Sequence, residues 1–130
     1  MHEWAIAEGI VEALLERGRR EGAKRITGFR LILGEIQGVE EELLRFALGE
    51  LSRGTMLEGA EVRVEREKGR VGCRSCGFEW FPERGSGEEE ALHFLPDLLP
   101  LFLKCPRCGS VDLEIKGGRG IWVSSLEIER

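Results

Sequence analysis

The 130-residue chain has room for one ordinary domain, or for a small domain with a metal-held appendage. Its formal net charge of -5 argues against a general binder of the nucleic-acid backbone, which needs a basic face. No stretch approaches about 20 consecutive apolar residues and the first residues lack a signal pattern, so the sequence predicts a cytoplasmic protein without a membrane span.

The first half of the chain predicts alternating helices and strands. Apolar residues recur at helical spacing over residues 4–20 and again over residues 39–51, which predicts two amphipathic helices. Residues 25–33 and 61–65 alternate in the way that half-buried strands do. A strand, a helix and a strand of these lengths suit a short crossover in which both helices cover one face of a sheet.

The second half contains two short cysteine segments, each of the form Cys-x-x-Cys-Gly. They lie at residues 73–77 and 105–109 and are called here the first and the second knuckle. A final strand over residues 121–128 is expected to return to the first sheet. The predicted fold class is therefore α+β, with a two-helix, three-stranded domain and an inserted, zinc-ribbon-like domain built on four cysteines.

The predicted domain boundaries follow from this order. Residues 1–68 form the first domain, residues 69–118 form the insert, and residues 119–130 are the strand that rejoins the first domain. Glycines at the return crossing predict a hinge; they are Gly117, Gly118 and Gly120.

The two knuckles together predict a tetrahedral zinc site. Two residues between cysteines let both sulfurs of a tight turn face one ion, and the following Gly permits a positive φ. Zn²⁺ accepts four thiolates with no open position, so the site stabilises a fold and does not hydrolyse a substrate. Rubredoxin-like iron, two disulfides and a redox dithiol are the alternatives. The predicted zinc ligands are Cys73, Cys76, Cys105 and Cys108.

His2 predicts a second metal site at the start of the chain. A free α-amine, the amide nitrogen of residue 2 and its imidazole can bind one ion through two chelate rings. Three such nitrogens in a plane favour Ni²⁺ and Cu²⁺, and the Glu3 amide or side chain lies within reach of the same ion. The alternative is that His2 is an exposed residue at a frayed chain end.

The remaining residues do not predict catalysis. The only histidines are His2 and His93, and the serines have no neighbouring His in the sequence. No Gly-rich phosphate loop follows a strand. We therefore predict that the protein is not an enzyme.

Several motifs occur together in this chain. They are Met1-His2-Glu3 at the start, the helix–strand–helix–strand order, Cys73-x-x-Cys76-Gly77 with Trp80 after it, and Cys105-Pro106-x-Cys108-Gly109-Ser110. The set, in this order, resembles the HypA family of hydrogenase nickel-maturation proteins. The likeness covers essentially the whole chain. The stretch between Cys76 and Cys105 is longer than in most bacterial members and resembles the extended archaeal type.

The resemblance implies a metallochaperone that delivers Ni²⁺ to the large subunit of [NiFe] hydrogenase. It implies a nickel-binding α/β domain, an inserted zinc domain, and the maturation GTPase HypB as the partner. In some bacteria, members of the family also serve urease. By position, the resemblance implies that Met1 contributes its amine, that His2 contributes its ring and amide, and that Glu3 lies at the nickel site.

His93 is predicted as a further nickel ligand. The N-terminal chelate offers three nitrogens, a square-planar ion needs a fourth donor, and His93 is the only other imidazole in the chain. The alternative is that His93 packs beside Phe94 and Leu95.

A different class of function is also compatible with paired knuckles, namely a zinc-ribbon module that binds nucleic acid or a transcription complex. Such a module is expected to cluster basic residues with exposed aromatic side chains. Here the basic residues around the knuckles are interspersed with glutamates, so we expect no nucleic-acid partner.

Overall fold

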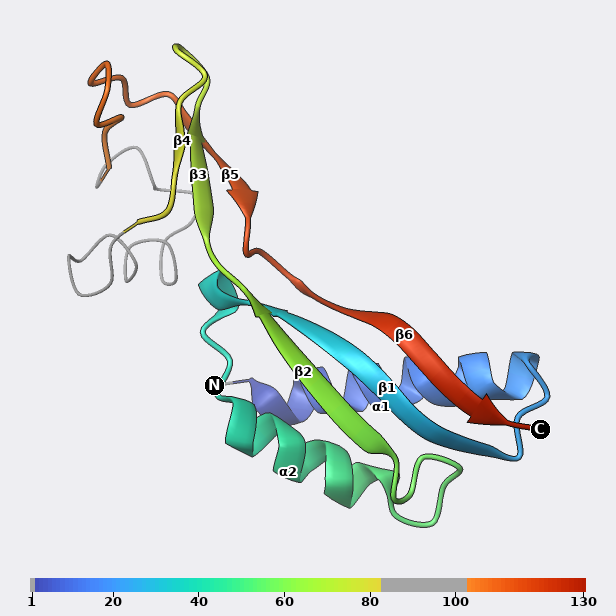
Figure 1. The fold of residues 1–130 in the computed structure, drawn as a ribbon. Helices are drawn as coiled ribbons and strands as arrows, with labels where there is room; N and C mark the ends of the chain where they lie inside the picture. The colour runs from blue at the N-terminus through green and yellow to red at the C-terminus, as the bar shows by residue number, and fades with distance from the viewer. Residues whose placement is uncertain (1, 83–102) are drawn as a thin grey trace. The chain divides into compact units, whose positions relative to one another are not determined.

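The computed structural model describes residues 2–82 and 103–130 (Figure 1). Contacts between residues divide the chain into two compact units. Unit 1 comprises Met1–Ile32, Val39–Glu65 and Trp122–Arg130, and unit 2 comprises Leu33–Gly38 and Arg66–Ile121. In the described part of the chain, neither helix has the length and apolar character that a membrane crossing requires.

Helix α1 (Glu3–Arg20) begins almost at the chain start, as the periodicity predicts. Its buried face follows helical spacing: Ala7, Val11 and Leu14. The helix ends before Gly22, whose φ of 68° allows the chain to reverse.

Helix α2 (Glu41–Ser52) begins two residues later than the periodicity predicts. Val39 is buried but lies before the helix, and Glu40 is the N-cap residue with an extended backbone, φ -82° and ψ 113°. An apolar residue just before the N-cap commonly packs on the first turn of the helix. Val39 therefore continues the helical spacing of apolar residues although it lies outside the helix.

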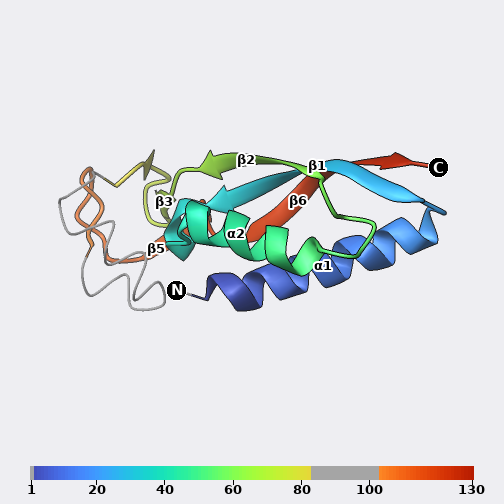
Figure 2. The same ribbon diagram turned by 90° about the horizontal axis from the view of Figure 1, so that it is seen from below.

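The sheet of unit 1 has the strand order β2-β1-β6, with bounds β1 (Arg25–Gly34), β2 (Glu61–Glu67) and β6 (Ile121–Glu129). In Figure 2, β1 and β2 run in the same direction and β6 runs against them, and both helices lie on one face of the sheet. The parallel pair is joined through α2, which confirms the predicted crossover. The core lies between the helices and β1, where Phe29, Leu31 and Leu44 are almost completely buried.

Unit 2 contains a small antiparallel sheet with the strand order β4-β3-β5. The strands are β3 (Arg70–Cys73), β4 (Glu79–Trp80) and β5 (Leu113–Gly117). The register places Val71 opposite Trp80 on one side and Ile115 on the other, and it places Cys73 opposite Leu113. The first knuckle therefore follows directly from a central strand.

Among the described residues, the core of unit 2 includes two of the cysteines. Its buried members are Ile36, Val71, Cys73, Leu103, Cys105 and Leu113, and Phe78, Trp80 and Ile115 pack against them. Ile36 comes from the short 3₁₀ helix η1 (Glu35–Gln37), far away in the sequence. A small unit of this kind commonly gains part of its stability from a structural metal.

Candidate metal centre

The two knuckles have the same local backbone structure. In the first, the Gly77 N–H donates to the Cys73 carbonyl at 2.9 Å, and the Cys73 N–H donates to the Phe78 carbonyl at 2.8 Å. In the second, the Gly109 N–H donates to the Cys105 carbonyl at 2.9 Å, and the Cys105 N–H donates to the Ser110 carbonyl at 2.9 Å. Two equivalent turns thus present four cysteines.

The glycine that ends each knuckle is needed for its backbone conformation. Gly77 has a φ of 80° and Gly109 a φ of 75°, a region that side chains with a Cβ adopt at a cost of roughly 1–2 kcal/mol. These turns direct backbone N–H groups toward sulfur. The N–H groups of Arg107 and Cys108 both lie 3.4 Å from the Cys105 sulfur.

The four sulfur atoms have the spacing of a tetrahedral site. Cys73 Sγ lies 3.6 Å from Cys108 Sγ, and Cys76 Sγ lies 3.7 Å from Cys105 Sγ. All four sulfurs lie within 4.8 Å of one another. Zn–S bonds of about 2.3 Å in a regular tetrahedron separate the sulfurs by about 3.8 Å. The donor set and its spacing therefore fit one zinc ion that is bound by both cysteines of each knuckle.

The surroundings of Cys73 favour its thiolate. Burial opposes ionisation, but hydrogen bonds from the backbone N–H of Cys76, the thiol of Cys108 and the backbone N–H of Ser75 lower the pKa of Cys73 to about 6. A thiolate at neutral pH is the form that binds a metal ion.

In the second knuckle, the pKa of the first cysteine, Cys105, is lowered in the same way. Against the effect of burial, the backbone N–H groups of Cys108 and Arg107 lower the pKa of Cys105. Cys108 behaves in the opposite way. A hydrogen bond from the Ser110 backbone lowers the pKa of the Cys108 thiol. Burial and the hydrogen bonds that this thiol donates to the other cysteines outweigh that effect and raise the pKa of Cys108 to about 12. Acid should therefore favour metal release, because protons compete for the two thiolates that the turns stabilise.

Further contacts join the two knuckles and were not predicted from the sequence. The hydroxyls of Ser75 and Ser110 lie 2.9 Å apart, and the Arg74 guanidinium pairs with the Asp112 carboxylate at 3.1 Å. The Arg74 N–H also donates to the Asp112 carbonyl at 2.9 Å. Nothing in residue spacing distinguishes these side chains from ordinary surface residues, because the contacts depend on how the two turns face each other.

His2 and Glu3 lie at the start of α1 in unit 1. His2 is exposed, occupies the N-cap position and makes no side-chain capping hydrogen bond, while its carbonyl accepts from the Ile6 N–H at 2.9 Å. Glu3 is only 6 % exposed, and its carboxylate accepts from the backbone N–H of Glu40 at 3.2 Å. The Glu3 side chain therefore joins the starts of the two helices.

The pKa of Glu3 lies below its ordinary value. Hydrogen bonding to the α-ammonium group of the chain has the largest effect, and the Glu40 N–H adds to it, while burial opposes both. The two other predicted nickel ligands, Met1 and His93, lie outside the described residues.

Comparison with known proteins places this geometry among nickel-handling proteins. The family described as "Hydrogenase/urease nickel incorporation, metallochaperone, hypA" matches residues 1–128. The "Hydrogenase maturation factor HypA" of Thermococcus onnurineus is 44 % identical over 135 residues, covering 100 % of this chain and 97 % of that protein. The protein of the same name from Pyrococcus horikoshii is 42 % identical over 135 residues, with the same coverage.

The fold also matches a solved structure. The solution structure of "the Ni metallochaperone HypA from Helicobacter pylori" superposes with a TM-score of 0.65 at 19 % identity, covering 98 % of this chain and 97 % of that one. At this identity the likeness concerns the fold, and it confirms the predicted α+β class.

Proposed function

This chain belongs to the HypA family of hydrogenase and urease nickel-incorporation metallochaperones, and from that premise we propose that it carries Ni²⁺ on its N-terminus for [NiFe] hydrogenase maturation. The ion is cargo, received at the start of α1 and passed on. We propose the large subunit of the hydrogenase as its destination, the GTPase HypB as the protein that takes part in the transfer, and the cytoplasm as the place.

The four-cysteine site is proposed to hold zinc permanently. Its four donors are all sulfur, at the separation that tetrahedral Zn–S bonding requires, and no donor position is left open. When bound, zinc supplies folding free energy to unit 2 and no reaction chemistry. Iron also accepts four thiolates, so metal analysis of the purified protein decides between the two.

The position of His2 supports the nickel chelate. Its imidazole is exposed and is not used to cap the helix. The first N–H groups of a helix have no carbonyl partner within the helix, so the helix does not use the amide nitrogen of His2 in its own hydrogen bonds. A planar set of one amine, one amide, one imidazole and a fourth donor suits Ni²⁺.

Glu3 is proposed to act differently from His2. Its buried carboxylate is held by the Glu40 N–H, so we propose that Glu3 contributes by holding the chain start in position rather than by offering that carboxylate to nickel. The carboxylate also places a negative charge near the positive end of the helix dipole, which otherwise opposes the approach of a cation. Glu3 thus positions the chelating end of the chain against the first turn of α2.

The observation that carries this proposal is an exposed histidine at position 2, at the N-cap of a helix, in a chain of this family. Apart from the four cysteines, the described residues contain no group of three or more His, Cys, Asp or Glu side chains arranged to hold a metal.

A transfer assay tests delivery. The chain is loaded with ⁶³Ni and mixed with HypB and nickel-free hydrogenase large subunit, in the presence of a chelator that captures free nickel. We expect radioactivity in the large subunit from the loaded chain and none from an equal amount of free ⁶³NiCl₂. Equal transfer from both sources would contradict the proposal, because the chain would then add nothing to diffusion of the ion.

His93 is proposed as the fourth nickel donor, contributed by the insert. Replacing it by alanine is expected to remove one imidazole from the donor set while the amine, amide and His2 donors remain, since a square-planar ion needs four donors. X-ray absorption spectroscopy of nickel-loaded protein counts the imidazoles. An unchanged imidazole count together with an unchanged nickel affinity would refute this assignment.

A further inference from the structure

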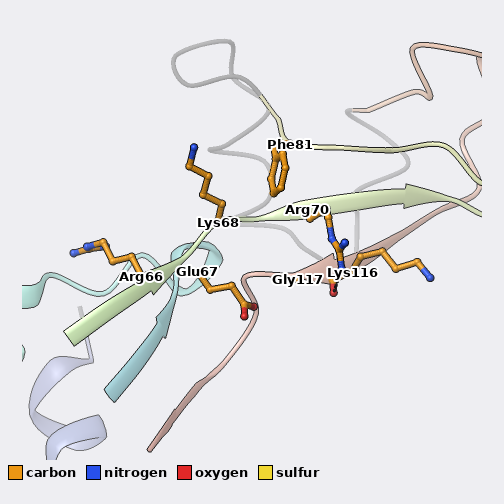
Figure 3. A pocket seen from close by; sticks show the side chains of 7 residues that line it. All are labelled: Arg66, Glu67, Lys68, Arg70, Phe81, Lys116 and Gly117. Carbon is orange, nitrogen blue, oxygen red and sulfur yellow. Dashed lines mark hydrogen bonds between the residues drawn. The ribbon is translucent and has the colours of Figure 1, made fainter. Parts of the chain in front are cut away.

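A basic pocket in unit 2 lies apart from the cysteine cluster (Figure 3). It has a volume of about 430 Å³, within the range of ligand-binding pockets. It is formed by the end of β2, the link to β3 and the end of β5, and its lining residues are Arg66, Glu67, Lys68, Arg70, Phe81, Lys116 and Gly117. Four of these side chains are cationic, in a chain whose net charge is -5.

Two of the cations are already held in place by acidic neighbours. The Arg70 guanidinium pairs with the Glu79 carboxylate at 3.1 Å, and the Lys116 ammonium pairs with the Glu114 carboxylate at 2.8 Å. Among the described residues, Lys68 has no ion-pair partner, and its side chain is exposed. Lys68 is therefore the cation most free to receive an incoming anion.

The acidic residue in the lining does not neutralise Lys68. The Glu67 carboxylate accepts the backbone N–H of Gly118 at 2.6 Å. This bond fixes the end of β2 against the end of β5 within unit 2. A Cβ on Gly118 would lie 2.6 Å from the Gly69 Cα, so the two segments next to the pocket pack backbone to backbone.

Phe81 adds an apolar surface beside these charges. Its side chain is 58 % exposed, although large aromatic side chains usually gain free energy from burial. Figure 3 shows the Phe81 ring next to Lys68, with the other cationic side chains extending in different directions. A single phosphate group needs cations that converge on one point. Cations spread around an aromatic ring instead suit an extended chain that carries several negative charges.

We propose that this pocket is a docking site for an acidic peptide segment of a partner protein, with a carboxylate on Lys68 and an apolar side chain on Phe81. A single-stranded nucleic acid is the competing polyanion. The structure favours the peptide, because Arg70 and Lys116 are partly neutralised and the described lining offers one aromatic ring, whereas nucleic-acid grooves combine a strongly basic track with successive rings. This inference does not depend on the nickel proposal.

Fluorescence anisotropy tests the site with zinc-loaded protein and labelled peptides. The first probe is Glu-Glu-Phe-Glu-Glu, and the second replaces its Phe with Gly. Lys68→Glu is expected to weaken binding of the Phe probe by about tenfold, because one attraction becomes a repulsion. Lys24→Glu, the same charge change at an exposed site in unit 1, is expected to have less than about a twofold effect, since salt screens distant charges.

Phe81→Ala separates the apolar contact from the charges. It is expected to weaken the Phe probe by about fivefold and to leave the Gly probe unchanged. Equal weakening by Lys68→Glu and Lys24→Glu would overturn the proposal, because net charge alone would then explain binding. Tighter binding of a labelled eight-nucleotide oligouridylate than of the Phe probe, lost in both Lys68→Glu and Phe81→Ala, would also overturn it in favour of nucleic acid.

Discussion

Replacing Cys76 with Ser is expected to unfold unit 2 and to leave the helices of unit 1 intact. Loss of one thiolate should reduce zinc affinity by more than the roughly 10–100-fold that loss of an outer-shell partner causes. In the described part of unit 2, the apolar cluster around Val71 and Leu113 remains without the metal. Because apparent zinc binding contributes about 10–16 kcal/mol in small zinc-finger peptides, its loss removes a large share of the free energy that folds the unit.

Two measurements follow the two units separately. The two α-helices of the described residues, α1 and α2, lie in unit 1, so their circular dichroism signal should remain, while the NMR signals of β3 and β5 lose their dispersion. Ser75→Ala is the matched control, because it removes the hydroxyl contact with Ser110 next to the same ligand. It should keep one zinc per chain and cost only about 1 kcal/mol. A Cys76→Ser protein that retains zinc and a folded unit 2 would contradict the assignment.

Replacing His2 with Ala is expected to abolish nickel binding and to leave zinc untouched. The change removes the imidazole and with it one of the two chelate rings, so the remaining amine and amide hold the ion only weakly. Isothermal titration of zinc-loaded, untagged protein with Ni²⁺ measures the loss. Acid should release nickel from the unaltered chain as well, because protons compete for the same nitrogen lone pairs.

The complementary variant controls this result. Cys76→Ser should lose zinc and still bind one nickel ion, because His2 and Glu3 lie in unit 1. Each variant then loses one metal and keeps the other. A His2→Ala protein that binds nickel with unchanged affinity would place the nickel site elsewhere in the chain.

The sequence predicted helices α1 and α2 and the grouping of four cysteines in unit 2, because each leaves a local pattern. Apolar spacing located α1 within one residue of its start, and the paired knuckles named four cysteines whose sulfurs do come together. The start of α2 was wrong by two residues, since Val39 continues the apolar spacing while the chain at Glu40 is still extended. The spacing of apolar residues indicates which side chains are buried, and buried side chains can continue beyond the last helical residue.

Other features depend on contacts between distant segments, which leave no local pattern. The strands β3 and β4 are too short to show alternation, and their pairing is fixed by the knuckle that joins them. At Gly34, a Cβ would lie 2.3 Å from the Gly118 carbonyl oxygen, so a close approach between segments far apart in the sequence requires glycine there. The predicted domain boundaries and the hinge remain predictions, which selective unfolding of unit 2 would test.

Native mass spectrometry of zinc-loaded, untagged protein, with the α-amine of Met1 either free or acetylated, tests whether nickel is held at the chain start. Acetylation converts the amine into an amide, keeps His2 at position 2 and leaves every side chain in place. We expect one nickel and one zinc on the chain with the free amine, and zinc alone on the acetylated chain at the same Ni²⁺ concentration. Equal nickel occupancy of both forms would refute the N-terminal site, because the terminal amine would then not be a ligand.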